Sequence, residues 1–539
     1  MHAWVRRFAV VLGLIGGFTL TDGASGGPSI VDDATAVNTS VAHLQARAAD
    51  WGIRKADDEF RLHRVVRDSL GQTHVRLDQV SEGLPVFGHQ LIVHLDQSGA
   101  PQSITGTYLA GITASPRPAV SGHQARAVAR GQFPGPLTET PQVELLWYPR
   151  NGVARLAYRV VLNDDETPRR VVAFVDAITG TLVHSFNDLR TIAPSPAWPP
   201  ASGGGAGTPA PEDAPAPAAP ATGVGNSLYV DTVQITTDQG ASGYTMVDGT
   251  RGNLSTSNMK NRRFGRGKVF SDSDNTWGDG TTGDPASAAV DAHLGAEMTW
   301  DYYLNVHGRD GIAADGVGAL SRVHFKHSYN NAFWSDGCQC ITYGDGDGIT
   351  FSPLTALDIA GHEMTHGVTS ATAALIYDNQ SGGLNEAMSD IFGTMVEFFA
   401  AANGVAKAPN YLIGEDAFTP GTPGDALRYM NDPTQDGQSI DTFANYNDNL
   451  NVHLSSGIAN NAFFLLAEGG THRLGGVVTG IGRSAAERIF YRALTVYMIP
   501  SETFSQARAH TTQAAIDLFG SGSQQALSVG QAWAACGVN

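Results

Sequence analysis

The stretch HEMTHGVTSATAALIYDNQSGGLNEAMSD, residues 362–390, places two histidines four positions apart. On a helix, positions i and i+4 lie on the same face, so His362 and His366 can bind one metal ion together. Glu363 follows the first histidine and can reach a water molecule at an open coordination position of that ion. The spacing predicts a helix that carries a zinc site, with Glu363 as the general base.

A catalytic zinc ion needs a third protein ligand. Glu386 lies on the next helical pattern, after the turn around residues 381–383, and an antiparallel helix pair would bring it to the metal. Asp390 stands one turn further along, where it can accept the second ring proton of a zinc-bound histidine, and Asn385 can do the same for the other. Taken alone, Glu386 and Asp390 would fit a solvated helix face, but beside the two histidines we assign them to the site.

Outside this stretch, the chain divides into a β-rich and a helical region. Residues 223–355 are rich in Gly, Asp, Asn, Thr and aromatics, which indicates short strands and long loops, with one helix near 285–306. We predict an α+β fold with a β-rich lobe at 223–375 that includes the zinc helix, and a helical lobe at 376–539. A cleft between such lobes is a natural place for a substrate. Apolar residues recur at helical spacing in segments 356–375, 384–402, 457–470, 483–498 and 504–520.

Residues 194–222 are rich in Pro, Ala and Gly, which is typical of an extended linker that proteases can reach. Before the linker, alternating apolar and polar residues at 74–99, 143–162 and 169–186 indicate strands. They predict two small α+β modules, at about 45–110 and 115–190, without a cluster of catalytic residue types. We therefore expect residues 25–193 to be a propeptide and the maturation site to lie in the linker, 194–222.

The amino terminus has the features of a secretory signal peptide. Arg6 and Arg7 precede the short apolar stretch 8–20, and small residues follow around Ala24. This stretch is shorter than the roughly 20 residues that span a bilayer. We expect residues 1–24 to be removed and the protein to be secreted and extracellular; an uncleaved signal anchor is the alternative. The formal charge of −18 and the absence of a long basic run argue against a nucleic-acid partner.

The active-site motifs resemble those of the thermolysin-like neutral metallopeptidases. The resemblance covers most of residues 223–539, and 74–99 and 143–186 are similar to the two prodomain modules of the same family. It implies a two-lobed zincin made as a secreted preproenzyme, with zinc-dependent endopeptidase activity. The further motifs, in the same order as in the family, are YNNAFW (329–334), YGDGDG (343–348), IGEDAFTPG (413–421), NVHLSSGI (451–458) and FYRALTVY (490–497).

The resemblance implies three further catalytic residues. His453 matches the histidine that assists the transition state, and Tyr377 matches the phenol that donates to the same oxyanion. Asp448 matches the carboxylate that orients His453, and a nearby carboxylate raises the pKa of an imidazole.

It also implies a substrate site. Asn331 and Ala332 match the edge segment that pairs with a substrate backbone, and Arg428 matches the guanidinium that binds the carbonyl after the cleaved bond. The implied specificity is cleavage on the amino side of Leu, Phe or Ile. The matching apolar pocket is formed by Phe351, Leu354, Ile359, Ile413 and Leu427.

Calcium is the second metal that the resemblance implies. Hard oxygen ligands suit this ion. Because Asn410 and Leu412 stand where the family's two-ion version has acids, we expect one ion at the main site. Asp272 with Asp274, and Thr419 with Asp425, match two lesser calcium sites and could equally be turn residues. The main site is matched by Asp358, Glu397, Asn410, Glu415 and the carbonyl of Leu412.

The three cysteines depart from the family's simplest pattern. Cys338 and Cys340 can form a small disulfide, because Cα atoms two residues apart just meet the geometric limits. Cys536 would then be a free thiol. A bond between Cys536 and either of the other two is the alternative.

We expect a monomeric endopeptidase with one catalytic zinc ion and structural calcium, acting on proteins and peptides. Its own propeptide is expected to serve as intramolecular inhibitor and chaperone, and no nucleic acid or membrane is expected as a partner. The alternatives are a catalytically inactive thermolysin-like binding protein and a zinc hydrolase of other substrates. The filled catalytic positions weigh against the first, and the substrate-edge segment 329–334 weighs against the second.

Overall fold

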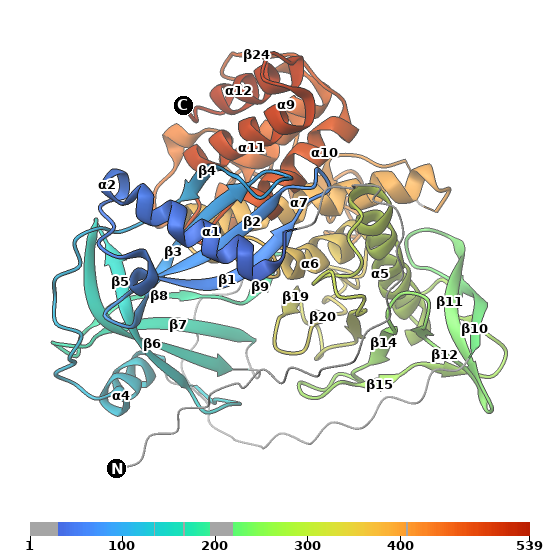
Figure 1. Cartoon of the computed structure of the whole chain (residues 1–539). Coiled ribbons are helices and arrows are strands. Elements are labelled where there is room, and N and C mark those ends of the chain that lie inside the picture. Colours follow the sequence, from blue (N-terminus) through green and yellow to red (C-terminus); the bar gives the residue numbers. More distant parts are fainter. Residues whose placement is uncertain (1–30, 134, 165–167, 195–218, 406–407) are drawn as a thin grey trace, which may run out of the picture.

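The computed structural model describes residues 31–133, 135–164, 168–194, 219–405 and 408–539. The predicted signal peptide, residues 1–24, and most of the predicted linker, 195–218, lie outside the described residues. Figure 1 shows three parts, a propeptide in blue and teal, a β-rich lobe in green and yellow, and a helical lobe in orange and red. Among the helices of the described residues, none is long and apolar enough to cross a membrane.

The region of the predicted propeptide, described here over residues 31–194, is built on one eight-stranded sheet. The first unit packs helix α1 (Asp33–Ala46) on four antiparallel strands, and α1 begins earlier than the predicted boundary near residue 45 because Asp32 caps it. The second unit packs α4 (Gly122–Gln132) on four more strands. The strands are β1 (Phe60–Arg67), β2 (Thr73–Ser81), β3 (Leu84–Leu95), β4 (Pro101–Gly106), β5 (Gln142–Arg150), β6 (Val153–Asp164), β7 (Arg169–Asp176) and β8 (Leu182–Asn187); short helices α2 (Ala48–Trp51) and α3 (Ala56–Glu59) precede β1.

The two predicted modules are therefore not separate sheets. Strands β3 and β5 pair in parallel at Val86 and Trp147 and join the two units. The Trp147 indole is fully buried and donates to the Ser81 carbonyl across this junction. After β8 the chain continues into β9 (Arg190–Thr191), which leaves the propeptide sheet and pairs with the catalytic lobe.

The β-rich lobe has a five-stranded and a seven-stranded sheet, against which α5 (Pro285–His307) and α6 (Leu357–Ser370) pack. Its first strand begins at Ala219, so the last four residues of the predicted linker, 219–222, are already strand. The first sheet contains β10 (Ala219–Asn226), β11 (Thr232–Gly240), β12 (Gly243–Thr245), β16 (Ser271–Asp272) and β17 (Thr276–Trp277). The second contains β9, β13 (Val247–Asp248), β14 (Leu254–Asn258), β15 (Lys268–Val269), β18 (Leu320–Val323), β19 (Ala332–Ser335) and β20 (Cys340–Tyr343).

The five predicted helical segments are confirmed, the first as α6 in the β-rich lobe and the other four in the helical lobe. The helical lobe also contains α12, which was not predicted although Ala526, Val529, Ala532 and Trp533 bury one face of it at helical spacing. The elements are α7 (Asn379–Ala402), α8 (Val452–Ser455), α9 (Gly457–Glu468), α10 (Arg483–Arg492), the π-helical turn η3 (Ala493–Tyr497), α11 (Phe504–Phe519) and α12 (Gln524–Ala535). Short pieces complete it: β21 (Leu412–Ile413), β22 (Arg428–Tyr429), β23 (Gly470–Thr471), β24 (Val477–Val478), η1 (Pro433–Asp436) and η2 (Phe443–Asn445).

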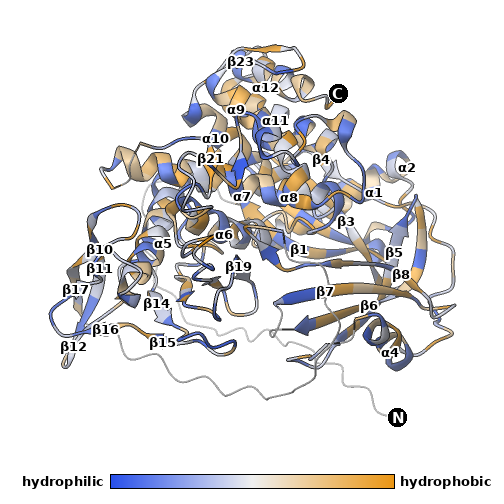
Figure 2. Cartoon of the chain, turned by 180° about the vertical axis from the view of Figure 1, so that it is seen from behind, coloured by the Kyte–Doolittle hydropathy of each residue, from blue (hydrophilic) through white to orange (hydrophobic). Residues whose placement is uncertain are grey.

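Helices α6 and α7 pack closely at the centre of the molecule, where α7 and α9 are largely apolar (Figure 2). Two glycines permit this approach. A Cβ atom on Gly361 would lie 2.9 Å from the Cα of Gly393, and a Cβ on Gly393 would lie 2.6 Å from the Asp358 carbonyl oxygen. Because glycines occupy both sides of this contact, α6 and α7 approach closely, and the polar residues of both helices come together in the core.

Candidate active site

Three side chains from α6 and α7 converge on one point, as predicted. The Nε2 atoms of His362 and His366 are 3.1 Å apart, and Glu386 Oε1 lies 3.3 Å from His366 Nε2. All three side chains are fully buried, and their ligand atoms lie within 4.8 Å of one another. Oε2 of Glu386 accepts no hydrogen bond from a described residue. Two imidazole nitrogens and a carboxylate oxygen without a donor fit a zinc ion with an open fourth position.

The remaining ring nitrogens of both histidines are held from α7. His362 Nδ1 lies 2.9 Å from Asp390 Oδ1, and His366 Nδ1 lies 2.8 Å from Asn385 Oδ1. Both contacts were predicted. Asp390 in turn accepts two hydrogen bonds from Arg428, at 2.9 and 2.6 Å. Such contacts fix the ring orientation, so that Nε2 of each histidine faces the metal position.

The charged groups of the site shift one another's pKa values. Burial alone would raise the pKa of Glu386, but the neighbouring imidazoles of His453 and His362 lower it to about 2. Burial also opposes the charge of Asp390, and Arg428 outweighs it and lowers the pKa of that carboxyl group. For Glu363, burial and the charge of Glu386 act in the same direction and raise its pKa well above the ordinary value. The ligand carboxylate is thus kept ionised, while Glu363 has a strong tendency to take up a proton.

A segment of the propeptide lies in the cleft beside these residues. Strand β9 pairs antiparallel with β19, and the Ile192 N–H donates to the Ala332 carbonyl at 3.3 Å. The Asn331 side chain makes two hydrogen bonds with the backbone of Ala193. It accepts from the Ala193 N–H at 3.1 Å and donates to the Ala193 carbonyl at 2.9 Å. Arg428 Nη1 donates to the Ile192 carbonyl at 2.5 Å. The predicted substrate-binding groups therefore hold residues 191–193 as an extended peptide.

The carbonyl of Thr191 accepts a hydrogen bond from His453, and Tyr377 lies beside His453. His453 Nε2 donates to this oxygen at 2.6 Å, and the Tyr377 hydroxyl lies 3.3 Å from the same nitrogen. Tyr377 also donates to Glu386 and interacts with the Thr191 backbone. His453 is thus placed on the Thr191 carbonyl oxygen, and Tyr377 contacts both His453 and the predicted metal ligand Glu386.

The predicted contact between Asp448 and His453 is not formed. The Nδ1 atom of His453 lies 2.8 Å from the side-chain oxygen of Asn451, whereas Asp448 is exposed and interacts with Tyr446. The predicted rise in the pKa of His453 is also wrong: burial lowers it, and this outweighs the charge of Glu386. Asn451 caps α8 with the same oxygen, and that position brings its amide rather than a carboxylate to the ring.

The predicted pocket residues and Ile192 belong to one buried apolar core. The Ile192 side chain is fully buried, and Phe351, Leu354, Ile359 and Ile413 belong to the same cluster of buried apolar side chains, with Leu427 packed against it.

The predicted calcium ligands form a separate cluster of acids between α6, α7 and the loop before β22. Asp358 accepts from the Gly414 amide at 2.5 Å, and Asn410 donates to Glu415 at 2.7 Å and accepts from the Leu412 amide. Burial, together with the charges of neighbouring acids, raises the pKa values of Asp358 and Glu415, and that of Glu397 to about 10. Asp416 contributes to all three shifts, and the sequence analysis missed it although it adjoins Glu415 in IGEDAF.

The predicted minor calcium residues are found in hydrogen-bonded turns. Asp272 accepts from the amides of Asp274 and Asn275, at 2.7 and 3.1 Å. Thr419 donates to Asp425 at 2.7 Å. These contacts fit the alternative of turn residues. The cysteines follow the first of the two patterns considered, with a Cys338–Cys340 disulfide and Cys536 as a buried free thiol.

A donor set that fits zinc, next to a cleft that already holds a length of peptide backbone, is the arrangement of a zinc-dependent peptidase. Comparisons with known families agree. Residues 222–370 match the family described as "Thermolysin metallopeptidase, catalytic domain", and residues 373–538 match its "alpha-helical domain". Residues 58–108 match the "Fungalysin/Thermolysin Propeptide Motif".

Several known proteins are similar to most of the chain. The thermostable neutral protease NprT of Geobacillus stearothermophilus is 40% identical over 503 residues, which cover 90% of this chain and 86% of that protein. A thermolysin of Alicyclobacillus acidocaldarius subsp. acidocaldarius is 40% identical over 489 residues, with 87% and 84% covered. A transglutaminase-activating metalloprotease of Streptomyces mobaraensis is 41% identical over 505 residues, covering 90% of this chain but 61% of that protein. The chain belongs to the thermolysin metallopeptidase family, and it is a zinc-dependent metalloendopeptidase with a propeptide.

Proposed function

We propose that this chain is a self-inhibited proenzyme that matures by cutting its own Thr191–Ile192 bond, and that the mature enzyme then cuts proteins before bulky apolar residues. One observation carries this proposal. The carbonyl of Thr191 lies on His453, and the carbonyl of the next residue, Ile192, lies on Arg428. A peptide in this register presents the Thr191–Ile192 bond to the metal position. The bond lies upstream of the linker, residues 194–222, in which the maturation site is predicted from the sequence.

The side chains around this bond have distinct roles in the proposed reaction. His362, His366 and Glu386 would hold the zinc ion, which supplies a Lewis acid and lowers the pKa of water. Glu363 takes a proton from the attacking water and passes it to the amide nitrogen of residue 192, whose N–H lies near its carboxylate. His453 and Tyr377 donate hydrogen bonds to the carbonyl oxygen as negative charge develops on it.

The same register supports the proposed specificity. The residue after the cleaved bond is Ile192, whose side chain is fully buried in the apolar cluster. Burying a large aliphatic side chain contributes about 1.5–3 kcal/mol, enough for a tenfold or greater preference over Gly or Asp. Leu, Phe and Ile are therefore the proposed residues on the amine side of the bond.

Calcium is proposed as a structural ion. Without a cation, Asp358, Glu397 and Glu415 share a buried site in which their pKa values are raised. An oxygen-rich group of buried acids from three segments suits calcium, which would join these segments next to the zinc helix. We further propose that the mature enzyme is secreted, works as a monomer, and has no nucleic-acid or membrane partner.

The test is to follow maturation of the purified precursor. The wild-type precursor should yield a first product that begins at Ile192, read by N-terminal sequencing. Glu363→Gln should bind zinc, remain uncut and lose nearly all turnover. As a control, Glu468→Gln changes an exposed glutamate and should mature normally. A first cut within 195–218, or more than about a tenth of wild-type activity in Glu363→Gln, would contradict the proposal.

A further inference from the structure

The propeptide segment in the cleft makes a charged contact that the proposed function does not use. Arg190 immediately precedes Thr191 and pairs with Trp334 in the β9–β19 ladder. Its Nη1 atom lies 2.7 Å from Asp336 Oδ2 and also donates to the Ser370 hydroxyl. The Arg190 side chain is only 12% exposed in the precursor.

Asp336 is held in place by the catalytic lobe itself. The Trp334 indole N–H donates to Asp336 Oδ1 at 2.7 Å, which leaves Oδ2 for the guanidinium. Trp334 in turn packs against the zinc helix, because a Cβ atom on Gly367 would lie 2.7 Å from its Cζ2 atom. The carboxylate is therefore oriented by groups that remain after the propeptide leaves.

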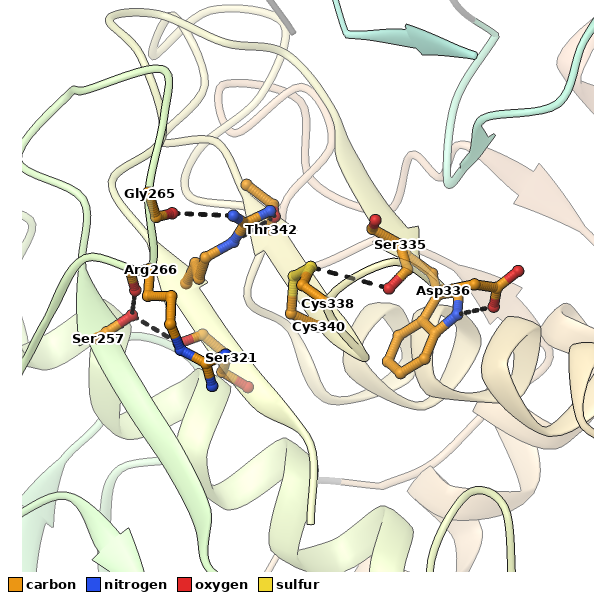
Figure 3. Close-up of a disulfide and its surroundings, with 11 residues drawn as sticks. Ser257, Gly265, Arg266, Ser321, Ser335, Asp336, Cys338, Cys340 and Thr342 are labelled. Atoms are coloured by element: carbon orange, nitrogen blue, oxygen red, sulfur yellow. Dashed lines mark hydrogen bonds between the residues drawn. A yellow bond between two sulfur atoms is a disulfide. The ribbon is translucent and has the colours of Figure 1, made fainter. Parts of the chain in front are cut away.

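A disulfide follows Asp336 in the segment that leads from β19 to β20. Cys338 and Cys340, the first residue of β20, are cross-linked at a Cα–Cα distance of 5.2 Å, and Figure 3 shows this bond in the same segment as Ser335 and Asp336. Gln339, between the cysteines, has a left-handed φ of 49°. Cys338 Sγ lies 3.8 Å from the Ser335 carbonyl oxygen, so the cross-linked turn contacts the residue that precedes Asp336.

The charge at this position is matched to a cation. Burial opposes the charge of Asp336, but Arg190 and the indole hydrogen bond outweigh it, and the pKa of Asp336 is lowered. Ser370 supplies a neutral oxygen acceptor on the other side of the guanidinium. The Asp336 carboxylate and the Ser370 hydroxyl both contact the side chain at this position. They favour binding of arginine or lysine there and disfavour glutamate or aspartate.

We propose that Asp336, with Ser370, forms a subsite that selects a basic residue two positions before the Leu, Phe or Ile that follows the cleaved bond. This inference rests on the proposed function, since it uses the register in which Thr191–Ile192 is cut. The preferred substrate sequence is then a basic residue, any residue, and a bulky apolar residue, with cleavage before the last. Arg190-Thr191-Ile192 is the chain's own example.

The test uses mature enzyme and four peptides based on residues 187–196, NDLRTIAPSP, with Arg, Lys, Ala or Glu at the position of Arg190. In a one-tube competition, wild-type enzyme should cut the Arg peptide with about five- to tenfold higher kcat/KM than the Ala peptide, as expected for a half-exposed charged pair. The Lys peptide should follow, and the Glu peptide should be poorest. In Asp336→Asn the Arg-to-Ala ratio should fall to about one to two. In Asp336→Lys the Glu peptide should overtake the Arg peptide.

The matched control is Asp315→Asn, an exposed aspartate that accepts from the Val317 amide, and it should keep the wild-type ratio. The readout is a ratio within each enzyme, so a general loss of activity does not affect it. An unchanged ratio in Asp336→Asn would overturn the subsite, even if that variant released its propeptide more easily. If wild-type enzyme instead cut none of the peptides at Thr–Ile, the proposed function itself would fail.

Discussion

Replacement of the residue that fills the apolar pocket is the most direct measure of the binding register. Ile192 is fully buried, while its backbone groups bond to Ala332 and Arg428. Ile→Ala at this position in the peptide NDLRTIAPSP removes three buried carbon atoms and leaves the backbone contacts unchanged. At about 0.8 kcal/mol for each carbon, the loss is ~2.4 kcal/mol, or about 60-fold in kcat/KM.

The assay is cleavage of paired peptides by mature enzyme, followed by mass spectrometry, with the bond identified from both fragments. An Ile→Leu peptide keeps the number of carbons and should lie within about tenfold of the parent, because volume-conserving changes cost less than ~1.5 kcal/mol. If the Ala peptide were cut at the same bond within about threefold of the parent, the Ile192 side chain would not occupy a specificity pocket. The assignment of Phe351, Leu354 and Ile359 to that pocket would then be wrong.

Three further perturbations address the propeptide interface and the calcium cluster. Arg76 is fully buried and donates to the carbonyls of Met498 and Thr495, so Arg76→Ala should weaken inhibition of mature enzyme by the propeptide about 10- to 100-fold, measured as an inhibition constant. His94 is also buried, and its surroundings lower its pKa well below the ordinary value; dissociation exposes it, so inhibition should be full above about pH 6.5 and weaken up to tenfold per pH unit below it. Removal of calcium with zinc kept saturating should shorten the thermal half-life, since an ion at a hundredfold excess over its dissociation constant contributes about 2.7 kcal/mol, and should leave the initial rate at low temperature nearly unchanged.

Each of these predictions has a control or an outcome that would contradict it. Arg61 donates to the Gly83 carbonyl within the propeptide, so Arg61→Ala should leave the inhibition constant near wild type. His94→Gln should flatten the pH dependence, and an unchanged slope would exclude this histidine as its source. If calcium removal abolished the initial rate while the half-life stayed constant, the ion would be catalytic. The charged groups that act with burial on His94 are His74, Arg76, His510 and Arg492.

The zinc site could be predicted because its geometry is local. The four-residue spacing of His362 and His366 needs only a helix, and Glu386, Asn385 and Asp390 need only a second helix packed against the first. Gly361 and Gly393 allow that packing, and both lie inside predicted helical segments. The pocket and the main-chain binding groups depended on the family resemblance, because no periodicity identifies them.

Other features depend on loop conformation, which sequence spacing does not determine. Within the segment NDNLNVH, residues 447–453, several polar side chains lie close to His453 in sequence, and the cap geometry of α8 selects Asn451 rather than Asp448. Asp416 lies next to Glu415, but its part in the acid cluster depends on the turn at Gly414. The occupation of the cleft by residues 190–193 is a tertiary contact, and the only hint in the sequence is an apolar residue, Ile192, just before the linker.

The joined sheet of the propeptide makes it a bivalent ligand of its own enzyme. Asp68 in the first unit pairs with Arg492 at 2.5 Å, and His184 in the second unit lies 2.8 Å from Asp378 at the start of α7. The pairing of Val86 with Trp147 connects the two units. While one unit is bound to the enzyme, the other unit is therefore kept at a high effective concentration near its own contact. Cutting the chain at Thr191 removes neither contact, so the severed propeptide should stay bound. Enzyme would then be freed at the rate at which the joined sheet is itself degraded.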